Sequence, residues 1–133
     1  MIVNILYELG IDDKEIKIML EQVPSIIDMS YEEINKKIDI LRYIDCSFRH
    51  IKNIIVSNPY YFDLLDDDVL KLIRYFKKIG VSNINLLFDS NPFILNKEVF
   101  EIKDYVSKRI DFGMSLEDIV DEIECNPYII DED

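Results

Sequence analysis

Apolar residues recur along this chain in step with its four prolines. The prolines are Pro24, Pro59, Pro92 and Pro127, at intervals of 35, 33 and 35 residues. Eight positions before each proline stands an isoleucine: Ile16, Ile51, Ile84 and Ile119. A second apolar residue lies four positions before each proline, so both share one face of a helix. A fixed period of this length predicts a stacked array of helical repeats.

Each proline is expected to end one helix and begin a corner. Proline lacks an amide hydrogen and clashes with the preceding turn, yet it is well tolerated in the first turn of a new helix. An apolar pair follows each proline, and a short 3₁₀ turn would bury both members. The pairs are Ile26–Ile27, Tyr61–Phe62, Ile94–Leu95 and Ile129–Ile130. The asparagine before three of the prolines fits this boundary because it tolerates non-helical backbone angles.

A second helix is predicted after each of the first three corners, over residues 30–44, 66–79 and 97–110. The spacings Asp12–Glu15, Ser30–Glu33 and Ser115–Asp118 predict capping boxes at helix starts. The third repeat lacks this spacing, and its first helix is expected to start at Ser82 or Asn83. Residues 1–9 read as the second half of a repeat. The predicted fold is one all-α solenoid domain over residues 1–133, with a corner at each proline. It has about three and a half repeats, at 10–44, 45–79, 80–111 and 112–133.

The phrases "LGIDDKEIKIMLEQVPSIIDMSYEEINKKIDIL" (9–41), "IGVSNINLLFDSNPFIL" (79–95) and "FGMSLEDIVDEIECNPYII" (112–130) resemble the repeat of the mitochondrial transcription termination factor (mTERF) family. Tetratricopeptide and HEAT-type arrays are the competing solenoids. The resemblance covers nearly the whole chain. It implies two α-helices and a 3₁₀ turn per repeat, stacked into a left-handed superhelix. It also implies nucleic-acid binding through basic side chains on the concave surface.

Composition and charge favour a different partner. The 133 residues are 49% hydrophobic and 32% charged, which is typical of a globular protein. The net charge of −12 is divided unevenly: −5 over residues 1–45, +2 over 46–109 and −9 over 111–133. Such an acidic chain favours a protein partner or a second copy of itself, with nucleic acid as the alternative. Nothing in the sequence indicates a small-molecule substrate.

The strongest candidate patch for either partner is basic. Lys71, Arg74, Lys77 and Lys78 lie three and four residues apart, so most of their charge falls on one side of a helix. Lys103 and Lys108 would extend the patch in the next repeat, and Arg42 would precede it. The functional interpretation is a stripe that contacts phosphates. The alternative is an ordinary solvated helix face, which nearby acids such as Asp104 favour.

Other candidates have structural explanations. The run Asp66–Asp68 suits a helix N-terminus better than a metal site, because no loop of alternating ligands follows. Cys46 and His50 are four residues apart, but no orienting partner or oxyanion loop is recognisable. We therefore expect no enzyme activity, cofactor or metal. The acidic end is a polar cap on the last repeat or a partner-binding face, and Tyr128, Ile129 and Ile130, with no following helix above them, would favour a homodimer.

Localisation follows from what the chain lacks. The N-terminal segment does not resemble a signal peptide, and no apolar run reaches the roughly 18 residues that a membrane span needs. Two isolated cysteines do not form a disulfide framework. These features predict a cytoplasmic protein that does not bind membranes.

Overall fold

A computed structural model describes residues 2–132, and within them it contains α-helices and 3₁₀ helices but no strand. The α-helices are α1 (Ile2–Glu8), α2 (Asp13–Gln22), α3 (Tyr31–Tyr43), α4 (Phe48–Ser57), α5 (Asp66–Ile79), α6 (Ile84–Ser90), α7 (Val99–Asp111) and α8 (Leu116–Cys125). The 3₁₀ helices are η1 (Pro24–Asp28), η2 (Pro59–Asp63), η3 (Pro92–Asn96) and η4 (Pro127–Glu132). This order confirms the predicted all-α class. The number of repeats and their boundaries stay predictions.

Each proline is the first residue of a 3₁₀ helix that directly follows an α-helix. The residue before it has left the α conformation in a similar way each time, from φ −135° and ψ 78° at Val23 to φ −140° and ψ 85° at Asn126. This is the conformation that a following proline imposes. The four isoleucines of the repeat, Ile16, Ile51, Ile84 and Ile119, are all buried.

The prediction that both apolar residues after each proline are buried is wrong at Ile27, which is 51% exposed, and Ile129 is only partly buried. Its counterpart in the next corner, Phe62, is buried and lines a cavity together with Met29 of the preceding segment. Within residues 2–132 no earlier corner packs against Ile27. Burial at this position therefore depends on the neighbouring repeat and not on the local sequence alone.

Polar side chains cap the N-terminal ends of most of the α-helices and so fix where these helices begin. Asp12 with Glu15 and Ser30 with Glu33 form complete capping boxes, as predicted. At Ser115 only half of the box is present, since the hydroxyl accepts from the amide of Asp118 without a reciprocal bond. Helix α6 begins after Asn83, whose side chain makes no capping bond.

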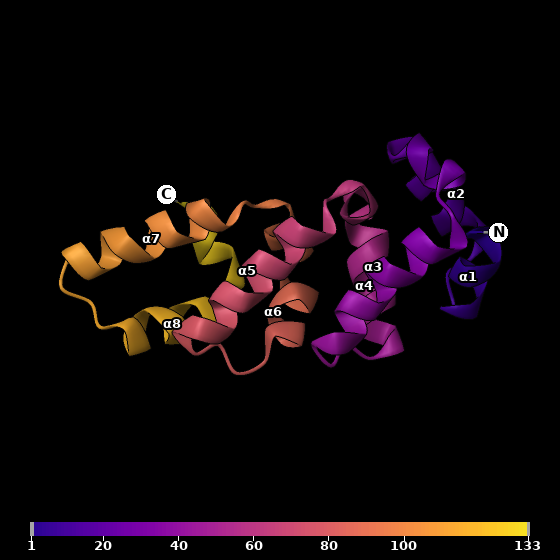
Figure 1. Ribbon diagram of the computed structural model, residues 1–133. Coiled ribbons are helices and arrows are strands. Elements are labelled where there is room, and N and C mark those ends of the chain that lie inside the picture. The colour runs from indigo at the N-terminus through magenta and orange to yellow at the C-terminus, as the bar shows by residue number, and fades with distance from the viewer. Residues whose placement is uncertain (1, 133) are drawn as a thin grey trace.

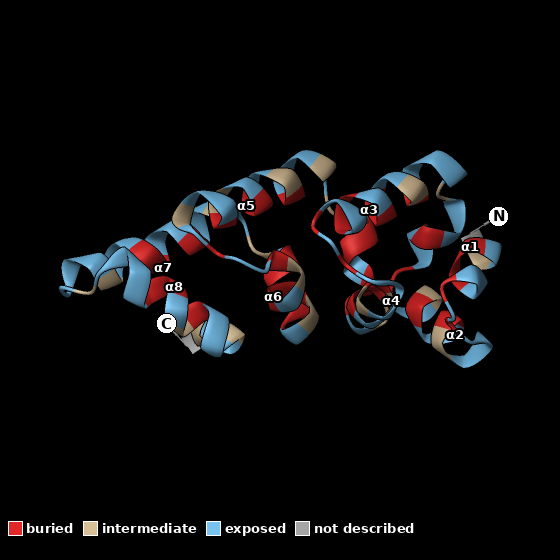
Figure 2. Cartoon of the chain, turned by 90° about the horizontal axis from the view of Figure 1, so that it is seen from below, coloured by how far each residue is buried: buried red, intermediate tan, exposed pale blue. Residues whose placement is uncertain are grey.

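The helices form two layers along an elongated molecule. In Figure 1 the chain advances from α1 and α2 at one end to α7 and α8 at the other. Helices α2, α4, α6 and α8 make one layer, and α3, α5 and α7 make the second, as Figure 2 shows. Buried residues lie on the helix faces that are turned toward each other (Figure 2). No helix within residues 2–132 combines the length and apolar character that crossing a membrane requires.

Buried asparagines join successive corners. Asn58, fully buried before Pro59, donates from Nδ2 to the carbonyl oxygen of Pro92 at 3.1 Å and to Oδ1 of Asn96 at 3.0 Å. Asn91, one repeat later, donates in the same way to the carbonyl of Pro127 at 3.2 Å and to Asp131 at 3.3 Å. The asparagine is thus more than a residue that tolerates a helix boundary. It ties the second corner to the third and the third corner to the fourth.

The two asparagines differ in how many of their side-chain amide atoms have hydrogen-bond partners. Oδ1 of Asn58 accepts from Nδ2 of Asn96 at 3.1 Å, which closes a reciprocal amide pair. Asp131 stands in the place of Asn96 in the next link, and a carboxylate has no proton to donate. Oδ1 of Asn91 consequently has no hydrogen-bond partner among the described residues. The first corner carries Val23 in place of asparagine, and there the hydroxyl of Ser25 donates to Asp63 at 2.7 Å instead.

Replacing Asn58 with alanine should lower the free energy of unfolding by about 2 kcal/mol, because it leaves the buried Pro92 carbonyl without this donor. Asn126→Ala is the matched control, since Asn126 precedes Pro127 in the same way but is exposed and makes no side-chain hydrogen bond within residues 2–132. Its effect should stay within about 0.5 kcal/mol. Urea denaturation followed by circular dichroism measures both, and equal losses would contradict the link.

Candidate functional site

Four basic side chains converge in a groove between α5 and α7. The groove has a volume of about 240 Å³, and its lining residues are Lys71, Arg74, Tyr75, Lys78, Val99 and Lys103. The first four come from α5 at spacings of three and four residues, which place them on one helix face. Four of the seven predicted cations therefore share one site. Sequence reasoning missed Tyr75 and Val99, whose side chains lie between the charges.

The charge of this groove is not neutralised by the chain itself. No carboxylate lines the groove, and none of its four cations forms an ion pair with any residue between 2 and 132. The nearby acids on α7 have other partners: Asp104 pairs with Lys108 at 3.1 Å, and Glu101 accepts from the backbone amide of Glu98 at 2.8 Å. Burial raises the pKa of Tyr75, so its hydroxyl adds no negative charge at neutral pH.

The other three predicted cations lie outside the groove. Arg42 pairs with Asp39 at 3.2 Å and Lys108 with Asp104, each on its own helix. Lys77 points toward α3, where its ammonium donates to the hydroxyl of Tyr43 at 3.1 Å. The predicted stripe is therefore divided into one concentrated groove and three separate charges.

An equivalent groove lies between α3 and α5, with different chemistry. Its volume is about 370 Å³, and it is lined by Lys36, Asp39, Ile40, Tyr43, Asp66 and Leu70. Counting from the preceding proline, these six positions correspond one by one to Lys71, Arg74, Tyr75, Lys78, Val99 and Lys103 of the basic groove. The array thus builds the same surface feature twice, once basic and once largely apolar. A comparison of residues one period apart would have found both.

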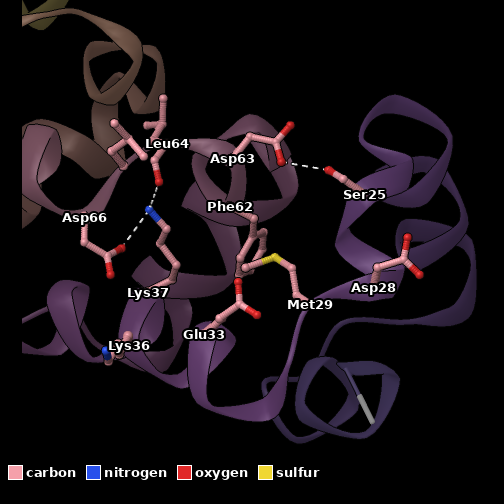
Figure 3. Close-up of a pocket in the computed structure, with 11 residues that line it drawn as sticks. Ser25, Asp28, Met29, Glu33, Lys36, Lys37, Phe62, Asp63, Leu64 and Asp66 are labelled. Atoms are coloured by element: carbon pink, nitrogen blue, oxygen red, sulfur yellow. Dashed lines mark hydrogen bonds and ion pairs between the residues drawn. The ribbon is translucent and has the colours of Figure 1, made fainter.

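A buried lysine fixes α3 against the start of α5. Lys37 is 4% exposed, and its ammonium forms an ion pair with Asp66 at 2.9 Å and donates to the carbonyl of Leu64 (Figure 3). The hydroxyl of buried Tyr61 donates to the carbonyl of Lys37 at 2.6 Å. Burial is the main reason that the pKa of Tyr61 is raised well above its usual value, so the hydroxyl stays a donor. These contacts set the spacing of the α3–α5 groove.

A cavity of about 490 Å³ lies beside this lysine. Asp28, Glu33 and Asp63 line it together with Lys36, and Figure 3 shows Ser25 pointing across toward Asp63. It mixes charges of both signs. No group of three or more histidine, cysteine or acidic side chains within residues 2–132 is placed to hold a metal ion.

The two grooves adjoin across α5. Lys77 lies over the ring of Tyr43, with its ammonium nitrogen 4.2 Å from the centroid. The hydrogen bond from Lys77 is the main reason that the pKa of Tyr43 is lowered, and the charge of Arg74 adds to this effect. Arg74 itself lines the basic groove. The charge of one groove therefore reaches the aromatic ring of the other.

The cysteine–histidine pair does not form a nucleophilic site. His50 is the third residue of α4, and its Nδ1 accepts from the backbone amide of Ser47 at 3.3 Å in a capping box. Cys46 is buried, and burial raises the pKa of its thiol to about 12. The thiol is therefore protonated at neutral pH. The run Asp66–Asp68 occupies the first turn of α5, where negatively charged side chains interact favourably with the helix dipole.

Comparison with known proteins adds one finding. The model of the mTERF family matches residues 1–88, about two thirds of the chain. The match includes α5 and therefore three of the four groove cations. No curated protein sequence matches the chain.

A thiol reagent such as Ellman's reagent should distinguish the two cysteines of the native protein. With a pKa of about 12, only roughly one Cys46 thiol in ten thousand is ionised at pH 8, so its reaction should be slow. Exposed Cys125 should react quickly and give one equivalent of product. The second equivalent should appear rapidly only in denaturant. Two equal native rates would show that Cys46 is not buried as described.

Proposed function

The chain belongs to the mTERF family, and from this premise we propose that it binds nucleic acid through the groove between α5 and α7. The family is one of helical-repeat proteins for which nucleic-acid binding is the general expectation. The observation that carries the proposal is the convergence of four unpaired cations in one groove. Lys71, Arg74, Lys78 and Lys103 give it a formal charge of +4 with no carboxylate in its lining.

The spacing of the cations suits a chain of phosphates. Lys71 and Lys78 are two helical turns apart, which is about 10 Å along the axis of α5. Lys103 faces them from α7. Cations at this separation can contact more than one phosphate of the same backbone, whereas a single small anion would leave some of them unused. A polyanion therefore fits better than an isolated phosphate.

The acidic character of the rest of the chain confines binding to this region. Residues 46–109 carry a net charge of +2, whereas the segments before and after them carry −5 and −9. A polyanion is repelled from both flanking segments and attracted to the middle one. The sequence-based preference for a protein partner or a second copy stays a prediction, since no contact within the chain bears on it.

Replacing both Lys71 and Lys103 with glutamine should weaken nucleic-acid binding about tenfold or more near 0.1 M salt. It should also lower the slope of log affinity against log salt by about 1.5. The matched control is Arg42→Gln with Lys108→Gln, which removes the same charge from cations that already pair with acids on their own helices. Fluorescence anisotropy of a labelled oligonucleotide at several salt concentrations measures both.

The control variant should bind almost as tightly as the unmodified protein. Equal weakening in the two double variants would mean that net charge alone, and not the groove, attracts the ligand. Absence of measurable binding by the unmodified protein at low salt would overturn the proposed function.

A further inference from the structure

We propose that the α3–α5 groove receives an unpaired base of the bound nucleic acid, so that the ligand is a single strand and not a duplex. This inference rests on the proposed function, because it takes the phosphates to lie in the neighbouring α5–α7 groove. It goes further in assigning a separate site to the base. That site has Tyr43 and the apolar side chains of Ile40 and Leu70 in its lining.

The number of phosphate contacts limits what can bind. Duplex-binding proteins with strong electrostatic affinity make about six to ten phosphate contacts. Within residues 2–132, the α5–α7 groove gathers four cations that form no ion pair. At the position equivalent to Arg74, the next groove has Asp39, and at that of Val99 it has Asp66. Lys36 is the single cation in the lining of that groove, so the two grooves together offer five cations, fewer than such a duplex contact uses.

Those two carboxylates do not repel a neutral base. Asp39 pairs with Arg42, and Asp66 pairs with Lys37 at 2.9 Å, so each charge is already balanced within the chain. What remains in the lining is the apolar side chains of Ile40 and Leu70, the ring of Tyr43 and one cation, Lys36. The apolar part of this lining suits an aromatic, uncharged group better than a phosphate.

Tyr43 is both exposed and held in place. Its side chain is 64% exposed, yet Lys77 donates to its hydroxyl at 3.1 Å and lies 4.2 Å from its ring centroid. A ring held from one side can accept a base on its other face with little loss of side-chain freedom. Single-strand-binding proteins combine a basic groove with aromatic side chains on which bases stack.

The α3–α5 groove and the α5–α7 groove are neighbours, so one nucleic-acid strand can contact both. Helix α5 forms a wall of both grooves, and the charge of Arg74 in the basic groove influences Tyr43 in the other. A strand whose phosphates contact Lys71 and Arg74 can turn a neighbouring base across α5 onto Tyr43. In a duplex that base would be paired and stacked, and unavailable without disruption of the helix.

The test compares three labelled ligands of equal phosphate number: a single strand of about ten nucleotides, an abasic strand of the same length, and a hairpin duplex. Each is titrated as DNA and as RNA. The unmodified protein should bind the single strand about tenfold more tightly than the abasic strand, a difference that corresponds to one stacked base. It should also prefer the single strand to the duplex.

Tyr43→Ala should reduce binding of the single strand to the level of the abasic strand and leave abasic binding unchanged. Tyr43→Phe, which keeps the ring, should retain most of the preference. The matched control is Tyr31→Ala, because Tyr31 lies on the same helix, is 63% exposed and lines neither groove. It should bind all three ligands like the unmodified protein.

The possible failures are distinguishable. If the abasic strand or the duplex binds as tightly as the single strand, or if Tyr43→Ala changes nothing, the base site is wrong while phosphate binding in the α5–α7 groove stands. If no ligand binds, or if loss of Lys71 and Lys103 has no effect on any of them, the proposed function itself fails. Thermal unfolding of each variant confirms that the exposed substitutions leave the fold intact.

Discussion

Buried side-chain amides hold the second corner of this protein to the third and the third corner to the fourth. Asn58 and Asn91 have no access to solvent, so their amides must find partners within the protein or destabilise it. The partners are the carbonyl oxygens of the prolines one period later. Asn58 thereby links η2, which precedes α5, to η3, which precedes α7, and these two helices form the basic groove.

The array repeats its backbone but not its chemistry. The α3–α5 and α5–α7 grooves are built from equivalent positions, yet one is lined by Ile40, Tyr43 and Leu70 and the other by lysines and an arginine. Side chains that line the grooves can differ because the buried residues of the repeats hold the helices together. Function in such a protein resides in differences between neighbouring units, and the shared pattern supplies only the frame.

Local patterns in the sequence were sufficient to predict the helices and corners, because capping residues, prolines and helical periodicity act within a few residues. Features that depend on a neighbouring repeat were not predictable in this way. Ile27 is exposed because no earlier corner covers it, and Asn58 is buried because a later corner does.

The basic site was predictable in part. The spacing of Lys71, Arg74 and Lys78 placed them on one helix side, but only the packing of α7 shows that Lys103 faces them. Arg42 pairs with Asp39, which is only three residues away, so the sequence already contained the reason to exclude Arg42 from the basic site.

Because each asparagine binds only the corner after it, the links couple nearest neighbours and nothing more distant. Breaking one should therefore loosen the junction at that point and leave the rest folded, so that amide hydrogens exchange with solvent section by section.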